Sequence, residues 1–142
     1  MQIDIATRAD DELFETFQRL VPQLTQNNPP PTREDLFALI NDSSSTLLLA
    51  RDDSGQIVGA LNLTVYRVPT GIRSIIEDVI VDISARGQGV GEALMQYAID
   101  LAKGKGAANI SLTSNPIRVA ANKLYLKLGF QKRETNAYQI KL

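Results

Sequence analysis

The sequence contains no cysteine and no histidine among its 142 residues. Without cysteine, the chain can form no disulfide, no thiolate metal site and no cysteine nucleophile. Without histidine, it lacks the commonest general base and metal ligand, and a Ser-His-Asp triad is excluded. We therefore expect no metal site. Proton transfer in an enzyme of this composition would depend on carboxylates, tyrosine, lysine or ordered water.

An excess of one charge and long apolar runs are also missing. Lys and Arg number 15 against 16 Asp and Glu, so the net charge is −1 and no basic surface for nucleic acid is indicated. No apolar stretch approaches the ~20 residues that cross a bilayer. Residues 1–5 lack the basic and apolar segments of a secretory signal. We expect a cytoplasmic protein with neither a nucleic-acid nor a membrane partner.

The length and the hydrophobic content of 44% are typical of one globular domain. Neither an internal repeat nor a linker divides the chain. We therefore predict a single domain over residues 1–142.

The first part of the chain predicts a short strand and two helices. Isoleucines alternate with polar residues over residues 3–5, as in a strand. A helix should open at Asp10, and Pro22 is expected to kink or break it. Beyond a proline-rich connector, Thr32 and Asp35 have the spacing of a capping box for a second helix. The residues expected on the inward faces are Leu13, Phe14, Phe17, Leu20, Val21, Leu24, Leu36, Phe37, Leu39 and Ile40.

The pattern then changes from helical to strand periodicity. Strands are predicted at residues 46–51, 57–67 and 72–82, with turn signals at 53–55 and 68–71. Because the connections are short, we expect an antiparallel meander.

The last part predicts the order helix, strand, helix, strand. The expected ranges are a helix at 89–103, a strand at 108–113, a helix at 117–128 ended by a left-handed Gly129, and a final strand or hairpin at 130–141. The inward face of the first helix is expected to contain Val90, Leu94, Tyr97, Ala98 and Leu101. That of the second is expected to contain Val119, Ala120, Leu124 and Leu128. The order predicts an α/β (α+β) fold with a mixed, mostly antiparallel central sheet flanked by helices.

A glycine-rich turn, Arg86-Gly87-Gln88-Gly89-Val90-Gly91, lies between a predicted strand and a predicted helix. Free N–H groups and the helix dipole make such a helix start a site for phosphate, and glycines let the anion approach the amides. A dinucleotide fingerprint fails because Glu92 stands three residues after Gly89, and no P-loop pattern is present. Glu92 is expected to point away from a bound anion. A tight turn without a ligand is the alternative.

Residues 79–94 resemble the acetyl-CoA-binding motif [QR]-x-x-G-x-[GA] of the GNAT superfamily of N-acetyltransferases. A second segment, with Asn115, residues 120–125 and residues 128–130, is similar to another part of the same family. The predicted order of elements matches that family along nearly the whole chain. The protein is therefore identified as a member of the GNAT superfamily.

The resemblance implies a site for acetyl-CoA as co-substrate. Strand backbone would pair with the pantetheine arm, and the amides of the glycine turn would hold the pyrophosphate. Two asparagines match the family pattern on the following strand and helix, although a turn or helix-face amide is the alternative for both. The implied cofactor-binding residues are Val79, Ile80, Val81, Arg86, Gly87, Gln88, Gly89, Val90, Gly91, Asn115 and Asn122.

Two residues are candidates for catalysis. Tyr125 matches the family tyrosine that protonates the departing thiolate, and the alternative is a core aromatic. Glu77 resembles the family's general base, acting directly or through water. Because Glu77 and Asp78 are neighbours in a strand, their side chains should point to opposite faces, and at least one should lie near the core. Asp78, water or a merely structural carboxylate remain alternatives for the base.

The resemblance implies transfer of an acetyl group from acetyl-CoA to a primary amine, by direct attack in a ternary complex. The acceptor would be a small-molecule or peptide amine, and a homodimer is compatible with the family. The alternative is a non-catalytic acyl-CoA-binding or regulatory domain, because a fold does not fix an activity. A dinucleotide-binding fragment is disfavoured by the failed fingerprint.

Overall fold

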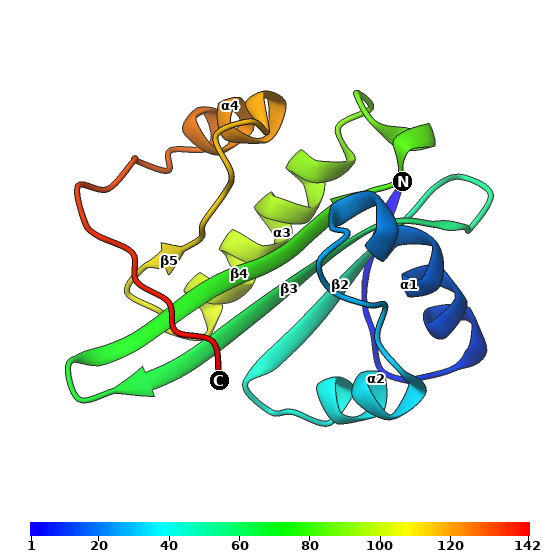
Figure 1. Ribbon diagram of the computed structural model, residues 1–142, viewed down its shortest axis with the longest axis horizontal. Coiled ribbons are helices and arrows are strands. Elements are labelled where there is room, and N and C mark those ends of the chain that lie inside the picture. The colour runs from blue at the N-terminus through cyan, green and yellow to red at the C-terminus, as the bar shows by residue number, and fades with distance from the viewer.

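The computed structural model describes residues 1–142 and has a five-stranded sheet with helices on both faces (Figure 1). The predicted fold class is confirmed. In chain order the elements are β1 (Gln2–Ile5), α1 (Asp11–Leu24), α2 (Arg33–Ile40), β2 (Ser45–Arg51), β3 (Ile57–Val68), β4 (Gly71–Val81), a 3-10 turn η1 (Ile83–Ala85), α3 (Val90–Gly104), β5 (Ile110–Ser111) and α4 (Val119–Lys127). No helix is long and apolar enough to span a membrane.

The strands lie in the sheet in their sequence order, from β1 to β5. The first four are antiparallel neighbours, as the short connections predicted. Only β5 is parallel to its neighbour β4, because α3 returns the chain to the end at which β4 began. The predicted strand at 108–113 is thus present with two paired residues.

Two apolar clusters cover the two faces of the sheet, as the alternation along β2 and β3 requires. Leu48, Leu61 and Leu63 pack against Leu94 and Met95 of α3. On the other face, α1 and α2 cover the second cluster, which contains Leu13, Phe17, Leu20, Leu36, Leu47, Leu49, Ile57, Ala60 and Ile80. The sheet is therefore buried on both faces along the middle of β2 and β3.

The helix starts follow the predicted capping residues. The Asp10 side chain accepts a hydrogen bond from the Leu13 amide, and Thr32 and Asp35 form the expected capping box. Pro22 was expected to kink or break α1, and the break is wrong, because α1 continues to Leu24. A proline this close to the helix end removes only one late N–H donor.

Two expected core positions are exposed, and one buried position was not expected. Phe37 of α2 is 65% exposed, because this short helix buries only the stripe that contains Leu36. In α3 the buried face includes Met95, whereas Tyr97 is exposed at its edge. These positions lie at the margins of an apolar stripe, where periodicity alone does not decide burial.

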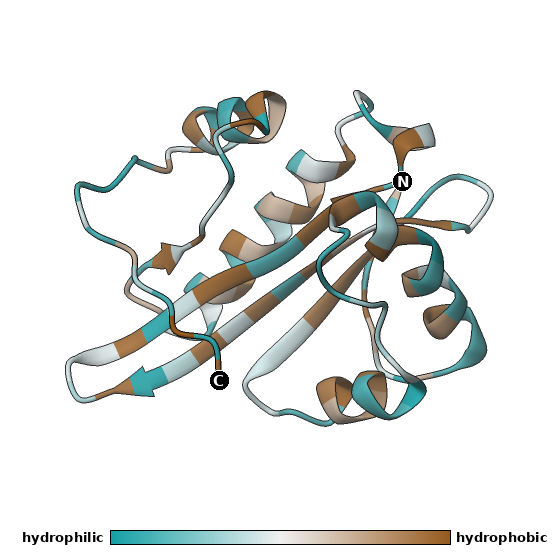
Figure 2. Cartoon of the chain, viewed as in Figure 1, coloured by the Kyte–Doolittle hydropathy of each residue, from teal (hydrophilic) through white to brown (hydrophobic).

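The predicted final strand or hairpin at 130–141 is wrong. Residues 131–142 adopt neither helix nor strand and are exposed. The first half of this segment is a polar run without alternation, which Figure 2 shows as a mainly hydrophilic stretch beyond α4. That polar run has no face to bury. In the second half Tyr138, Ile140 and Leu142 alternate with other residues, but no backbone ladder joins them to a strand of the sheet and their side chains are exposed.

Gly59 lets α3 approach β3 closely. A Cβ atom at this position would lie 2.9 Å from Val90 Cγ1, 3.1 Å from Leu94 Cδ1 and 3.2 Å from the Ile80 carbonyl oxygen. Since Val90 begins α3, this contact also places the start of that helix over the sheet.

We predict that Gly59→Ala lowers the free energy of unfolding by about 1–3 kcal/mol, because the buried neighbours must move to admit the methyl group. Gly104→Ala is the matched control. Nothing lies within 4 Å of a Cβ atom there, so stability should be unchanged or slightly increased. Urea unfolding followed by circular dichroism measures both variants, and equal stabilities would contradict the close-packing argument.

Candidate active site

Strands β4 and β5 separate partway along β4. Their pairing is limited to Ser74 with Ile110 and Ile75 with Ser111, whereas β4 continues to Val81. Beyond Ser111 the chain leaves the sheet and leads to α4 (Figure 1). The second half of β4 therefore has a neighbouring strand on only one side.

A cleft of about 670 Å³ occupies this separation. One wall is the end of β4 with the glycine turn and the first turn of α3. The other wall is α4, and the end of α1 contributes Gln23 and Leu24. Most of the lining residues are apolar, and the charged side chains on the cleft come from Arg86, Glu92 and Arg118. Such a cleft suits a long ligand with an anionic end.

The glycine turn presents unpaired amides to the cleft. The first hydrogen bond of α3 runs from the Ala93 amide to the Gly89 carbonyl at 3.0 Å, and the amides of Val90, Gly91 and Glu92 have no acceptor in the chain. Gly87 and Gly89 have φ values of +76° and +81°, which favour glycine and allow the chain to turn into the helix. The 15-residue helix adds its dipole, so the turn can bind an anion.

An ion pair between a buried carboxylate and a partly exposed arginine anchors the start of this turn. Asp82 is 6% exposed and pairs with Arg19 of α1, whose second guanidinium nitrogen donates to the Ile57 carbonyl at 2.8 Å. Burial acts to raise the pKa of Asp82. That effect is outweighed by the Ser84 amide and hydroxyl, which donate to the carboxylate, and by the Arg19 charge, so the pKa lies below its usual range. Helix α1 thus fixes the point at which β4 ends.

The charged residues beside the glycine turn are held by other groups. Arg86 Nε donates to the Val81 carbonyl at 3.2 Å. The Glu92 carboxylate accepts from Lys127 Nζ of α4 at 3.0 Å. This pair offsets the carboxylate charge with a cation, but Glu92 still lines the cleft, so the expectation that it points away from a bound anion stays a prediction.

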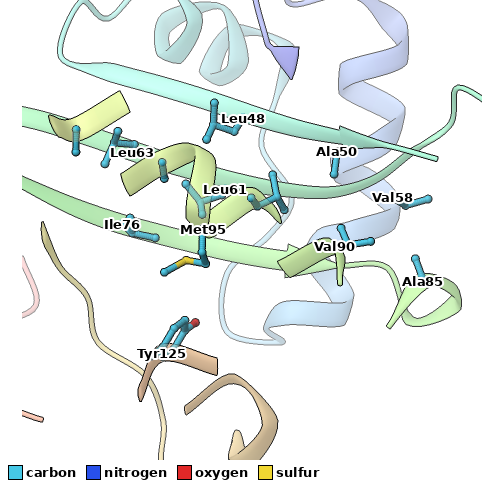
Figure 3. Packing of buried hydrophobic residues seen from close by; sticks show 13 residues of the cluster. Leu48, Ala50, Val58, Leu61, Leu63, Ile76, Ala85, Val90, Met95 and Tyr125 are labelled. Carbon is cyan, nitrogen blue, oxygen red and sulfur yellow. The ribbon is translucent and has the colours of Figure 1, made fainter. Parts of the chain in front are cut away.

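Tyr125 belongs both to the core and to the cleft wall. It is 6% exposed, and Figure 3 shows it extending from α4 toward Met95. Gly129, at φ +98°, ends α4, and the Phe130 amide donates to the Tyr125 carbonyl at 3.0 Å. Burial raises the pKa of the Tyr125 phenol, and the positive charge of Arg118 partly opposes that rise.

The inward face expected for α4 is partly wrong. Val119 and Ala120 are exposed, although both line the cleft, and Tyr125 is the buried residue of this helix. Helix α4 is held away from β4 by the cleft, so its inward stripe faces an open space at its first turn and the core only further along.

Asn115 and Asn122 hold the connection that precedes α4. Asn122 Nδ2 donates to the Asn115 and Arg118 carbonyls at 3.0 and 2.8 Å. The Asn115 side chain accepts from the Ile117 amide at 3.0 Å. Neither asparagine lines the cleft, so their role in cofactor binding stays a prediction. Gln88 also lies outside the lining and donates to the Ser84 carbonyl at 3.4 Å.

Arg118 was missed by the sequence analysis. It stands at the start of α4 and lines the cleft, and its Nη2 lies 3.5 Å from the Val79 carbonyl. The carbonyls of Val79 and Val81 point to the same side of β4 because they are two residues apart. Each therefore meets one arginine, Arg118 or Arg86. The only sequence signal for Arg118 was its position between two family-like asparagines.

The expectation that Glu77 or Asp78 lies near the core is wrong. Both are exposed, because β4 has an irregular register here: Ala60 pairs with Ile80, but Asn62 pairs with Glu77. Two residues of β4, including Asp78 at φ +53°, thus oppose one residue of β3. Partial burial, followed by the charge of Asp78, still raises the pKa of Glu77 above its usual range.

The structure thus brings most of the predicted residues to one cleft. Val79, Ile80 and Val81, the turn residues Arg86, Gly87, Gly89, Val90 and Gly91, and Tyr125 all line it. Glu77 lies outside the lining, four residues before Val81 on the same strand. The cleft thus combines an apolar wall with unpaired amides at one end, which suits a long ligand with an anionic end.

The chain belongs to the acetyltransferase (GNAT) family, whose model matches residues 10–130. It is 34% identical over 103 residues to a mycothiol acetyltransferase of Renibacterium salmoninarum, which covers 69% of this chain and 30% of that protein. It is also 34% identical over 92 residues to a glucosamine 6-phosphate N-acetyltransferase of Trypanosoma brucei brucei, covering 63% of this chain and 60% of that protein. The chain therefore spans less than two thirds of the length of either relative.

A solved structure extends the likeness to the whole fold. An acetyltransferase of Trypanosoma brucei superposes with a TM-score of 0.79 at 25% identity, covering 99% of both chains. This similarity agrees with the family membership that the two sequence motifs and the order of elements indicated.

We predict that Asp82→Asn lowers the free energy of unfolding at pH 7 by about 1–2 kcal/mol, because Arg19 loses its buried partner but remains partly solvated. Since the folded-state pKa of Asp82 is lowered, its contribution is complete above the unfolded pKa and is lost as the pH falls through the folded pKa. The difference in the free energy of unfolding between Asp82→Asn and wild type should therefore become smaller below about pH 4.

Urea unfolding between pH 2.5 and pH 7 measures this difference. Asp53→Asn serves as the control, since the fully exposed Asp53 pairs only with the terminal amine and its removal should leave stability unchanged. A pH-independent difference for Asp82→Asn would contradict the electrostatic account of this anchor.

Proposed function

We propose that this domain transfers an acetyl group from acetyl-CoA to a primary amine by direct attack in a ternary complex, without an acyl-enzyme. The observation that carries the proposal is the cleft itself. Unpaired amides at the start of α3 and Tyr125 line the same space beside an unpaired strand edge. The family membership of residues 10–130 supports the same reaction class.

The residues of the cleft fit coenzyme A along its length. The amides of Val90, Gly91 and Glu92 would bind the pyrophosphate, with Arg86 nearby. The β4 edge at Val79 and Val81 offers backbone groups that would pair with the amides of a pantetheine arm, which would replace the Arg118 and Arg86 contacts of the two carbonyls. The apolar lining from α4 would cover the same arm.

Two side chains would move the protons. Acetyl-CoA supplies a thioester whose sulfur leaves as a thiolate. Tyr125 would donate its proton to this sulfur, because its raised pKa keeps the phenol protonated at neutral pH. Glu77, whose pKa is also raised, would accept the proton of the attacking amine, directly or through water. The absence of cysteine and histidine agrees with attack by the acceptor itself.

The acceptor would bind on the open face of the sheet beside Glu77. Asn62 is the direct cross-strand partner of Glu77, so both side chains lie on one face. Asn62 Nδ2 donates to Thr64 Oγ1 at 3.2 Å, and Thr64 Oγ1 lies 3.3 Å from Ser45 Oγ. Figure 1 shows that α1 and α2 do not cover the β3–β4 end of the sheet, where the C-terminal segment passes in front of the strands in this view.

This row of uncharged polar groups favours a small, hydroxyl-bearing amine as acceptor. Asn62 Oδ1 has no hydrogen-bond partner in the chain, so a polar ligand or water must satisfy it. The name of one relative gives an amino sugar phosphate as its acceptor, which is the same chemical class. A peptide amine is the second acceptor class, and the open face would admit its terminal residue.

We predict that acetyl-CoA binds to the wild-type protein and that Gly89→Ala weakens this binding about tenfold. An alanine at φ +81° is strained by about 1 kcal/mol, and its relaxation would move the amides of the turn. Isothermal titration calorimetry measures the affinity, and Gly104→Ala is the control. Absence of heat with the wild type would overturn the binding proposal.

We predict that thiol release from acetyl-CoA with an amino sugar or another small amine follows a bell-shaped pH profile. Glu77→Gln should remove the acidic limb, because the carboxylate accepts a proton only above its pKa. Tyr125→Phe should lower kcat about tenfold or more, with little change in KM, because the phenol acts in the transition state.

A thiol-reactive dye follows this release over an acceptor panel. Tight acetyl-CoA binding without release for any amine would support the alternative of a non-catalytic acyl-CoA-binding domain. An unchanged kcat in Tyr125→Phe would remove the acid role of Tyr125 while leaving the transferase proposal intact.

A further inference from the structure

Two residues of α1 hold two consecutive residues directly after β4. Arg19 pairs with the Asp82 carboxylate, and Gln23 Oε1 accepts a hydrogen bond from the Ile83 amide at 2.8 Å. Residues four apart are neighbours on a helix surface, and Gln23 Nε2 also donates to the Arg19 carbonyl at 3.4 Å. We call Arg19 and Gln23 the α1 clasp, because together they tie α1 to the segment that leads into the glycine turn.

The Ile83 amide depends on Gln23 for its hydrogen bond. Ile83 begins the 3-10 turn η1, and the first amides of a helical turn have no partner inside it. The next two amides of η1 bond locally, Ser84 to the Asp82 carboxylate at 3.1 Å and Ala85 to the Asp82 carbonyl at 2.8 Å. The Ile83 amide is instead satisfied from 60 positions earlier in the chain.

The glycine turn beyond η1 is held mainly at its two ends. The amides of Gly87, Gln88 and Gly89 have no acceptor in the chain. Nothing lies within 4 Å of a Cβ atom at Gly87 or Gly89, so no neighbouring element packs against the turn there. At one end Val90 packs close to Gly59, and at the other end stands the α1 clasp. The orientation of the free amides therefore depends on both ends.

Gln23 also faces the cleft that this turn borders. It is half-buried and belongs to the cleft lining, whereas Arg19 does not. The polar side chains of the turn itself bond back to the same stretch of chain, Arg86 to the Val81 carbonyl and Gln88 to the Ser84 carbonyl. They do not join the turn to a helix. Gln23 does, and it does so at the cleft.

We propose that Gln23 is a positioning residue for the cofactor: its bond to the Ile83 amide, together with the Arg19–Asp82 pair, holds the glycine turn so that its free amides converge on the pyrophosphate of acetyl-CoA. This inference rests on the proposed function. Amides that are already ordered bind an anion more tightly, because binding does not have to order them. Loss of the Gln23 bond should weaken binding of the phosphate-bearing part of the ligand and spare the pantetheine part.

The first test needs no ligand. Methionine matches the length of glutamine but is only a weak acceptor, whereas glutamate keeps the oxygen acceptor. In Gln23→Met the ¹⁵N order parameters of Gly87 and Gly89 should fall from about 0.85 toward about 0.6, and in Gln23→Glu they should stay at the wild-type values. Gln18→Met is the matched control and should change neither value. Gln18 is an exposed residue of α1 outside the cleft lining, and its Nε2 donates to the Pro31 carbonyl at 3.3 Å.

The second test compares two ligands, coenzyme A and pantetheine, of which only coenzyme A carries phosphates. Gln23→Met should weaken coenzyme A binding about tenfold and pantetheine binding less than about twofold, whereas Gln18→Met should change neither affinity. Calorimetry measures the first ligand and NMR shift titration the second. A structural role alone would weaken both ligands equally, which separates it from positioning.

Equal weakening of the two ligands in Gln23→Met would overturn the proposal, as would an unchanged affinity for coenzyme A or an equal loss in Gln18→Met. Unfolding of Gln23→Met in the absence of urea would also overturn it, by assigning Gln23 a purely structural role. Absence of coenzyme A binding to the wild type would instead overturn the proposed function. The order parameters of the ligand-free protein would then still decide whether Gln23 holds the turn.

Discussion

The early end of the β4–β5 pairing is the constraint on which the candidate site depends. Backbone N–H and C=O groups inside a sheet are normally bonded on both sides, and β4 loses its second partner after Ile75. The carbonyls of Val79 and Val81 accept from arginine side chains instead of from another strand. An uncovered strand edge beside an apolar wall can pair with the amides of an extended ligand, as the proposed binding of a pantetheine arm requires.

The elements around this strand edge are held in place by the apolar clusters on the two faces of the sheet. Arg19 and Asp82 tie α1 to the end of β4, and Gly59 lets Val90 begin α3 close over the sheet. Across the cleft, Tyr125 is set into the same apolar cluster as Met95. The anion-binding turn and the phenol thus sit on elements that packing holds in place, so the distance between them does not depend on a flexible loop.

Sequence patterns predicted the elements well wherever an apolar stripe or a capping residue was strong. The capping box of α2, the three meander strands and the helix after the glycine turn fall within about two residues of their predicted bounds. Errors occurred where the local signal was ambiguous. Phe37 lies at the margin of the apolar stripe of α2. Glu77 was misplaced because a bulge at Asp78 interrupts the alternation of side chains along β4.

The sequence by itself indicated the family, located the glycine turn and marked Tyr125 as a candidate site residue. Each of these depends on residues that lie close together in the chain. Only the tertiary structure decided that these residues share one cleft and that Arg118 joins them. It also showed that Asn115 and Asn122 bond to their own turn. The reason is physical: where β4 and β5 separate, and which side chains reach the gap, depends on packing between segments more than thirty residues apart.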